Sequence, residues 1–140
     1  AQIADAVGVM YAAGMAEIAS VGELFRTPAH PYTQSLFKAL PRLGSKQDRL
    51  EAIPGNVPNP LRFPGGCRFH PRCGLTREKA VTRPADAVEI DTNEGRDRVL
   101  ARCARENPPL REIAPNHWCA CWECPSYDTA AVTDPGERIL

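Results

Sequence analysis

The amino-terminal part of the chain alternates hydrophobic and polar positions as a β-hairpin does. Over residues 6–11, Val7, Val9 and Tyr11 fall on one side of an extended chain. The next three residues (AAG) offer a turn, and residues 15–19 resume an extended apolar pattern. We therefore expect two antiparallel strands joined by a short turn.

Two short helices are predicted after the hairpin. Residues 22–26 (GELFR) form a helical turn that the following Thr-Pro pair closes. A second helix begins at Pro31, whose ring is preset for the first helical turn, and ends before Pro41. Its apolar face consists of Tyr32, Leu36 and Leu40.

Regular structure is sparse in the rest of the chain. Residues 50–53 could form a short strand, but prolines and glycines crowd residues 54–71 and predict a fixed, extended loop. Residues 94–103 can form a helix with Val99 and Cys103 on one face. The residues from about 125 onward are polar and predict a mobile tail. The pattern as a whole is that of an α+β protein.

Composition narrows the possible functions. The 140 residues include 17 basic and 17 acidic side chains, which argues against a nucleic-acid partner or a lipid-surface module, because both need a basic field. The uncharged stretch over residues 6–16 is too short to span a bilayer and does not form a signal peptide. The chain starts with Ala1, so an earlier segment could have been lost.

Six cysteines are the candidate source of order in a chain that is only 6% aromatic and has 14 prolines. They are Cys67, Cys73, Cys103, Cys119, Cys121 and Cys124. Four thiolates suit either zinc or an iron–sulfur cluster. Only the last pair has the tight spacing of a zinc knuckle, since five residues separate the first pair.

Other side chains near the cysteines could assist such a site. His70 and His117 could complete a mixed zinc site, although a partly exposed structural histidine is the plainer interpretation of each. Basic side chains near the first cysteine pair could offset thiolate charge or form a solvated face; they are Arg68, Arg72, Arg77, Lys79 and Arg83. The catalytic and phosphate-binding motifs of common enzymes are absent from the sequence.

Several motifs, in order, resemble the ATP-binding subunits of ABC importers for oligopeptides and dipeptides. Residues 3–14 resemble the strand pair that follows the switch histidine, and residues 27–33 (TPAHPYT) carry the His-Pro-Tyr hallmark of this branch. Residues 50–60 (LEAIPGNVPNP), 66–73 (GCRFHPRC) and 109–121 (PLREIAPNHWCAC) are similar to its special C-terminal extension. The resemblance runs in register from Ile3 to Trp122.

The resemblance implies a fold, partners and a location. It divides the chain into the end of an ABC ATPase domain (1–43), the C-terminal extension with its cysteine site (44–124) and a tail (125–140). The whole subunit would hydrolyse ATP with Mg²⁺ at the cytoplasmic face of the inner membrane. It would work there with two transmembrane permeases, a paired ATPase and, indirectly, a peptide-binding protein. This chain lacks the ATPase motifs, so we expect it to be an inactive C-terminal fragment.

In some members of the family the extension holds a [4Fe–4S] cluster on four cysteines. Carried over by position, the ligands would be Cys67, Cys73, Cys103 and Cys121. Cys119 and Cys124 would be spectators, although either could replace Cys121. The segment over residues 74–102 is longer than the usual link, which makes Cys103 the least certain of the ligands.

Two hypotheses from other classes compete with this interpretation. The chain could be a stand-alone zinc-binding interaction module that shares these segments. It could also be a secreted domain held by disulfides, in which case no free thiols are expected.

Overall fold

The computed structural model describes residues 4–40 and 53–124, and it has the α+β architecture that the pattern predicts. The helices are α1 (Val21–Arg26), α2 (Pro31–Lys38), α3 (Gly74–Thr82) and α4 (Ala101–Arg105), with short 3₁₀ turns at His70–Arg72 and Pro84–Asp86. The strands are β1 (Ala6–Tyr11), β2 (Gly14–Ser20), β3 (Ala87–Thr92), β4 (Gly95–Leu100), β5 (Arg111–Ala114) and β6 (His117–Cys119).

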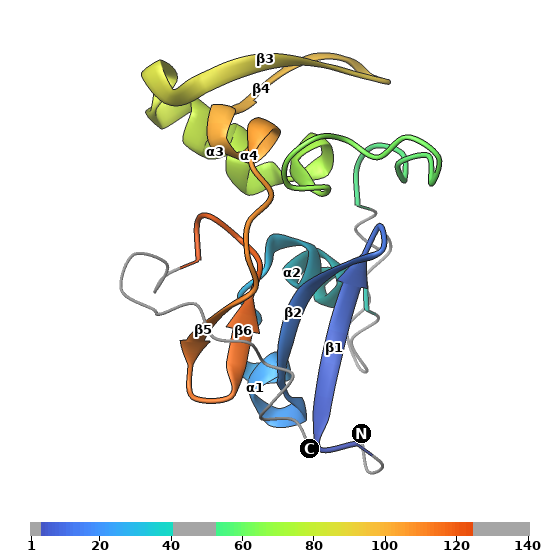
Figure 1. The fold of residues 1–140 in the computed structure, drawn as a ribbon, viewed down its shortest axis with the longest axis vertical. Coiled ribbons are helices and arrows are strands. Elements are labelled where there is room, and N and C mark those ends of the chain that lie inside the picture. The colour runs from blue at the N-terminus through green and yellow to red at the C-terminus, as the bar shows by residue number, and fades with distance from the viewer. Residues whose placement is uncertain (1–3, 41–52, 125–140) are drawn as a thin grey trace, which may run out of the picture.

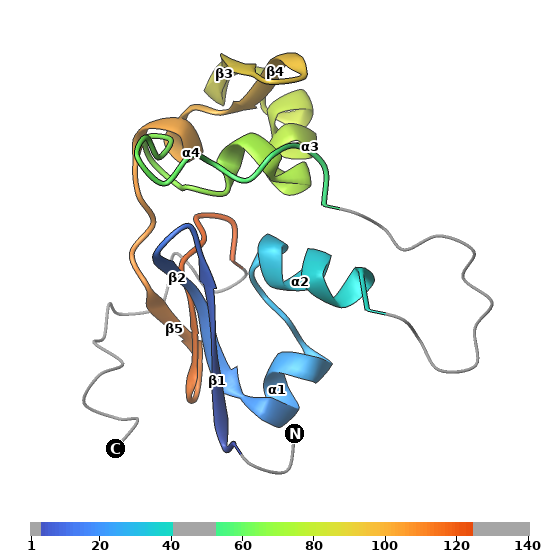
Figure 2. The same ribbon diagram turned by 90° about the vertical axis from the view of Figure 1, so that its right-hand side faces the viewer.

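The larger sheet joins the two ends of the described chain. Its strand order is β1-β2-β6-β5, and every neighbouring pair is antiparallel. Strand β2 pairs with β6 through Glu17 opposite Cys119 and Ile18 opposite Trp118. Helices α1 and α2 lie on one face of this sheet (Figure 2). Residues far apart in sequence therefore share one core, in which Trp118 is almost fully buried.

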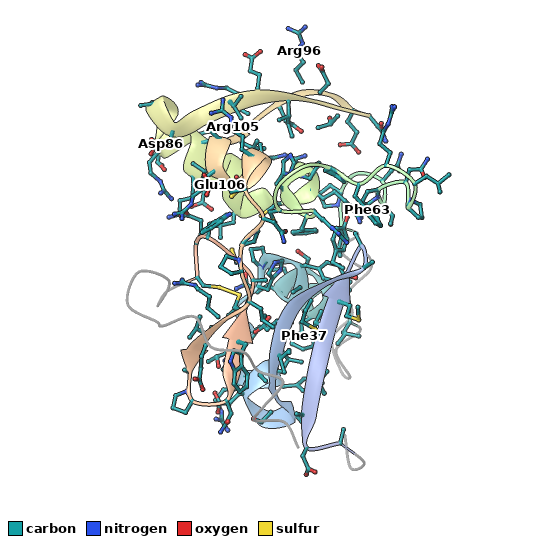
Figure 3. All side chains as sticks on the ribbon, in the orientation of Figure 1. Phe37, Phe63, Asp86, Arg96, Arg105 and Glu106 are labelled. Carbon is teal, nitrogen blue, oxygen red and sulfur yellow. A yellow bond between two sulfur atoms is a disulfide. The ribbon has the colours of Figure 1, made fainter. Side chains whose placement is uncertain are left out.

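A second layer lies beyond the end of the sheet. It consists of α3, α4 and the β3–β4 hairpin, with the loop over residues 53–69 beside them (Figure 1). Charged side chains such as Asp86, Arg96 and Arg105 lie on the outside of this layer (Figure 3). Within residues 4–40 and 53–124, no helix is both long and apolar enough to cross a membrane.

The predicted hairpin and helices near the amino terminus are confirmed. Strands β1 and β2 flank a two-residue turn at Ala12 and Ala13, which have φ angles of 48° and 60°. Helix α2 has its proline at the first helical position, and the His30 side chain caps it by accepting a hydrogen bond from the backbone N–H of Tyr32 at 3.0 Å.

The predicted helix over residues 94–103 is wrong. Residues 95–100 form β4, which pairs with β3, and only residues 101–105 are helical. The helix prediction rested on Val99 and Cys103, which are both buried but lie on different elements. Two features favour the hairpin instead. β-branched side chains alternate along β3, and Gly95 at the turn has a φ of 126°.

The loop predicted over residues 54–71 is confirmed for residues 54–69, which contain neither helix nor strand, whereas residues 70 and 71 belong to a short 3₁₀ turn. The strand expected over residues 50–53 falls mostly outside the described residues. So do the proposed domain boundary at residue 43 and the tail after residue 124. These remain predictions from sequence.

Candidate metal centre

The four cysteines predicted as ligands line one cavity of about 20 Å³. Cys67 follows the glycine pair of the loop, and Cys73 immediately precedes α3. Cys103 lies in α4, and Cys121 follows β6. All four are free thiols, and all except the half-buried Cys67 are buried. The second layer and the sheet thus each contribute sulfur atoms to the same cavity.

Burial and mutual repulsion keep these thiols protonated in the metal-free chain. Burial raises the pKa of Cys67 to about 11 and that of Cys73 to about 12, and the pKa values of Cys103 and Cys121 also lie above the usual 9.0. Each of the six possible pairs among the four thiols interacts electrostatically. A cationic group in this cavity would remove that repulsion and favour the thiolates.

Gly66 permits the close approach of two of the cysteine-bearing segments. It has a φ of 62°, and a Cβ atom there would lie 2.5 Å from the Cys103 carbonyl oxygen and 2.7 Å from the Ala104 carbonyl carbon. The neighbouring Cys67 N–H donates to the same Cys103 oxygen at 2.9 Å. Gly66 therefore allows Cys67 to lie beside Cys103.

Thr76 fixes the other side of the cavity. Its hydroxyl accepts a hydrogen bond from the Leu100 N–H at 2.9 Å, at the point where β4 gives way to α4. A further hydrogen bond involving Thr76 lowers the pKa of Cys103, partly offsetting the effect of burial. Thr76 is 2% exposed and lines the cavity, so it links α3 to the strand and helix that carry Cys103.

Two arginines favour a thiolate at Cys103. Arg83 and Arg102 both lower its pKa, against the larger effects of burial and of the Glu123 carboxylate, which raise it. Arg83 forms an ion pair with Glu123, the sole acidic side chain that lines the cavity, and Arg102 stacks on Trp122 with its guanidinium carbon 3.6 Å from the ring centroid. Charges of both signs therefore border the cavity on the side of α4.

The other basic residues near the first cysteine pair have different contacts. Arg72 donates to the carbonyl oxygens of Pro54 and Ile53 at 2.8 and 3.0 Å, which holds the start of the loop. Arg77 pairs with Asp97 of β4 at 2.8 Å. These two side chains act as structural ties, which is neither of the roles that the sequence suggested.

The His-Pro-Tyr motif joins the sheet to the cysteine loop. Tyr32 packs against Tyr11 and Phe69, with ring centroids 4.7 and 5.4 Å away. His30 lines the cysteine cavity, and burial lowers its pKa to about 4. The expected apolar stripe is only partly buried, because Leu40 lies beyond the end of α2 and is 49% exposed. The motif thus contributes to the wall of the cavity as well as starting a helix.

The two candidate histidine ligands occupy different places. His70 is buried in the wall of the cavity, and its Nδ1 donates to the Cys67 carbonyl oxygen at 2.8 Å. His117 does not line this cavity; its Nε2 lies 2.7 Å from a carboxylate oxygen of Glu17 in the core of the sheet. Both are buried rather than partly exposed, and His117 pairs with a carboxylate.

The two cysteines expected to be spectators are joined to each other. Cys119 and Cys124 form a disulfide (Figure 3), and both are buried beside Cys121 and Ile113. This pairing leaves the four predicted ligands as free thiols. A domain stabilised entirely by disulfides, one of the alternatives from sequence, does not fit four free cysteines.

The spacing of the donors bears on which metal they suit. Among the described residues, no three His, Cys, Asp or Glu side chains lie close enough together to hold a single metal ion. Four sulfurs bound to one zinc ion would be only about 4 Å apart, given a Zn–S distance of about 2.3 Å. A four-iron cluster carries its sulfur ligands on separate iron atoms and spaces them more widely. The donors in the described part of the chain therefore do not form a single-ion site as they stand.

Residues 16–79 match the family described as "Oligopeptide/dipeptide transporter, C-terminal region". This segment runs from β2 through the His-Pro-Tyr motif and the first cysteine pair into α3. The matched segment is therefore an oligopeptide/dipeptide transporter C-terminal region. This match confirms the family that the sequence motifs resemble. Cys103 and Cys121 lie beyond the matched residues.

The chain is similar to relatives from Brucella that are named peptide import ATP-binding proteins. It is 44% identical over 80 residues to one from Brucella melitensis biotype 1, which covers 57% of this chain and 24% of the relative. It is 37% identical over 111 residues to one from Brucella ovis, which covers 75% of this chain and 31% of the relative. The chain thus spans about a quarter to a third of these relatives.

Proposed function

We propose that this chain is the C-terminal region of an ATP-binding subunit for peptide import, and that its four free thiols bind a structural [4Fe–4S] cluster. The observation that carries the proposal is the convergence of Cys67, Cys73, Cys103 and Cys121 on one buried cavity. The first two lie in the segment matched to the oligopeptide/dipeptide transporter family. The names of the Brucella relatives support the assignment to peptide import.

In this proposal the chain's own residues hold the cluster and keep water from it. The four thiolates bind the iron atoms, while Pro31, Phe69 and Leu75 supply the apolar wall. The cluster's own chemistry is to join distant segments by iron–sulfur bonds, and binding energy of this kind is folding energy. A cluster is larger than the cavity of about 20 Å³, so we expect the surrounding side chains to move outward when it binds.

The residues that would carry the ATPase activity of the whole subunit are not among those that the structure describes. We propose that nucleotide binding with Mg²⁺, and ATP hydrolysis, belong to a longer protein of which this chain is part, since it covers 24% and 31% of two relatives. The partners would be two membrane permeases, a second ATPase and a peptide-binding protein outside the membrane. The location would be the cytoplasmic face of the inner membrane.

Anaerobic purification tests the cluster. The chain is expected to be brown, with iron and sulfide present in equal amounts. Cys67→Ser and Cys73→Ser are each expected to lose the cluster and the order of residues 55–122. The matched control is the double variant Cys119→Ser with Cys124→Ser, which should keep the iron. A colourless protein with stoichiometric zinc would contradict the cluster, and equal iron loss in the control would contradict the choice of the four ligands.

Uptake of a radiolabelled dipeptide tests the transport assignment separately. Deletion of the gene in its own host is expected to reduce uptake, and the unaltered gene should restore it. Unchanged uptake after deletion, in a strain without a second dipeptide importer, would contradict peptide import and leave the cluster result intact.

A further inference from the structure

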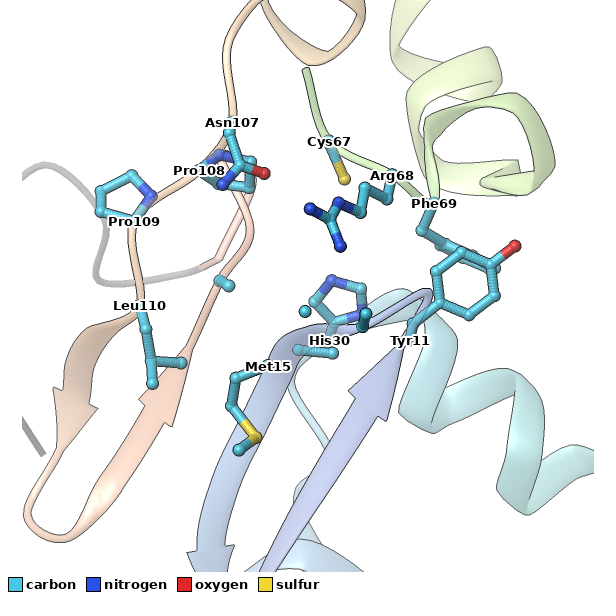
Figure 4. Close-up of a pocket in the computed structure, with 14 residues that line it drawn as sticks. Tyr11, Met15, His30, Cys67, Arg68, Phe69, Asn107, Pro108, Pro109 and Leu110 are labelled. Atoms are coloured by element: carbon cyan, nitrogen blue, oxygen red, sulfur yellow. The ribbon is translucent and has the colours of Figure 1, made fainter. Parts of the chain in front are cut away.

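A second cavity, of about 350 Å³, lies next to the thiol cavity (Figure 4). Its wall comes from the β1–β2 turn, the His-Pro-Tyr motif, the first cysteine loop and residues 107–110. His30, Cys67 and Phe69 line both cavities and separate them. The volume is within the range that proteins use for small organic ligands, about 300–1,000 Å³.

The charge on the wall of this cavity is entirely positive. Arg68 is the single charged side chain among its lining residues, which include no aspartate or glutamate. Within the described part of the chain, Arg68 forms no ion pair; it donates to the Ala12 carbonyl oxygen and lies 4.5 Å from the Phe63 ring centroid. His30 adds no charge at neutral pH, because burial lowers its pKa to about 4. The guanidinium is thus held in place without a counter-ion.

Polar and apolar groups occupy different sides of the cavity. In Figure 4 the Arg68 guanidinium and the Asn107 amide lie on one side, whereas Met15 and Leu110 lie on the other. A guanidinium and an amide are donors that suit a carboxylate. The opposite wall suits an aliphatic side chain. The cavity is therefore complementary to a small molecule with one carboxylate and an apolar body.

We propose that this cavity binds the carboxylate end of a short apolar peptide. Arg68 and Asn107 hold the carboxylate, and Met15 and Leu110 contact the last side chain of the peptide. The choice of a peptide rests on the proposed function, whereas the preference for a carboxylate rests on Arg68 and Asn107. An occupant also contacts Cys67 and His30, so the site adjoins the wall of the thiol cavity.

Isothermal titration of the 140-residue chain with dileucine tests this site. We expect saturable binding, at least about tenfold weaker for dileucine amide, which lacks the carboxylate. Arg68→Gln should weaken dileucine binding about tenfold or more. Arg62→Gln, which changes an exposed arginine outside this cavity, should leave binding unchanged. Leu110→Trp fills the apolar side without removing the charge and should also abolish binding.

Three results would overturn the proposal. They are equal binding of the acid and the amide, full competition by inorganic phosphate, and unchanged binding in both Arg68→Gln and Leu110→Trp. Full competition by phosphate would show a general anion site. Metal content is measured on the same samples, so loss of peptide binding in an iron-containing chain is distinguishable from failure of the cluster. Peptide binding by an iron-free chain keeps this site and contradicts only the cluster.

Discussion

Glu17 is a buried acid around which the sheet and the His-Pro-Tyr motif meet. It is 0% exposed, and its carboxylate accepts hydrogen bonds from the backbone N–H groups of Ala29 and His30 at 2.7 and 2.9 Å, besides its contact with His117. Burial by itself raises the pKa of Glu17, but these hydrogen bonds outweigh it and bring the pKa below the usual 4.5. The folded state therefore favours the ionised carboxylate.

Glu17→Gln is expected to destabilise the chain by about 3 kcal/mol at pH 7, because the amide cannot accept all of these hydrogen bonds. Since the folded pKa is depressed, the stabilisation is present above about pH 4.5 and is lost as the pH falls through the folded pKa. Urea unfolding between pH 7 and pH 3 should therefore show a weaker acid dependence in the variant. Glu23→Gln, at an exposed acid, is the control; an equal loss there would contradict the role of Glu17.

Gly66→Ala is expected to separate Cys67 from Cys103, because the added Cβ meets backbone atoms that cannot turn away. Residual strain from a left-handed alanine adds about 1 kcal/mol. Thermal unfolding by circular dichroism should show a lower midpoint, and iron binding should fall with it. Gly22→Ala, where nothing lies within 4 Å of the new Cβ, should leave both unchanged or raise the midpoint slightly. An unaltered midpoint for Gly66→Ala would contradict the close approach.

At the scale of elements, the predictions that held are those with local causes. Alternation in β1 and β2 acts within a few residues, as does the proline that begins α2. The local sequence pattern was therefore enough to predict these elements. The prediction of a helix over residues 94–103 was wrong because pairing with β3 stabilises β4. Two apolar positions alone are compatible with the repeat of a helix and with that of a strand. Strands β5 and β6 were not predicted, since they are only four and three residues long.

The grouping of four cysteines was predictable, whereas the contacts around them were not, and their role as metal ligands stays a prediction. Family motifs pointed to four cysteines, which the structure brings to one cavity. The roles of Glu17, Gly66 and Thr76 depend on neighbours distant in sequence, so no local pattern could reveal them. A lone charge inside an apolar strand marks Glu17 as unusual in the sequence, but it does not identify the residues that contact it.

Ala13→Gly is expected to stabilise the β1–β2 hairpin. Ala12 and Ala13 both have positive φ angles, and a two-residue hairpin turn of this type favours Asn-Gly. Glycine at position 13 relieves about 1 kcal/mol of left-handed strain, so the thermal midpoint should rise. Ala39→Gly, at a residue with φ −80°, should instead lower the midpoint. A fall for both variants would show that the turn is not strained.

At the scale of the whole molecule, the thiol cavity couples stability to pH. The folded pKa values of Cys67 and Cys73, about 11 and 12, lie above the usual 9.0. The protonated thiols therefore stabilise the fold below about pH 9, and this contribution is lost as the pH rises through the folded pKa values. The metal-free chain is thus sensitive to alkali.

Urea unfolding of the metal-free chain is expected to require progressively less urea between pH 9 and pH 11. Cys73→Ala removes the thiol that has the higher pKa of these two and should reduce that dependence. Iron binding, which needs thiolates, should instead strengthen as the pH rises from 6 to 8. Stability that stays flat up to pH 11 would contradict the burial of these thiols.

The pairing of β2 with β6 also sets a delay during synthesis on the ribosome. Glu17 and His117 are 100 residues apart, so β2 and its glutamate are made long before their partner exists. At about 5–20 residues per second, the wait is about 5–20 seconds. Throughout it, a newly made β2 has one strand edge without its native neighbour and a carboxylate without its imidazole. A nascent chain of this design is exposed to chaperones and proteases until its last strand emerges.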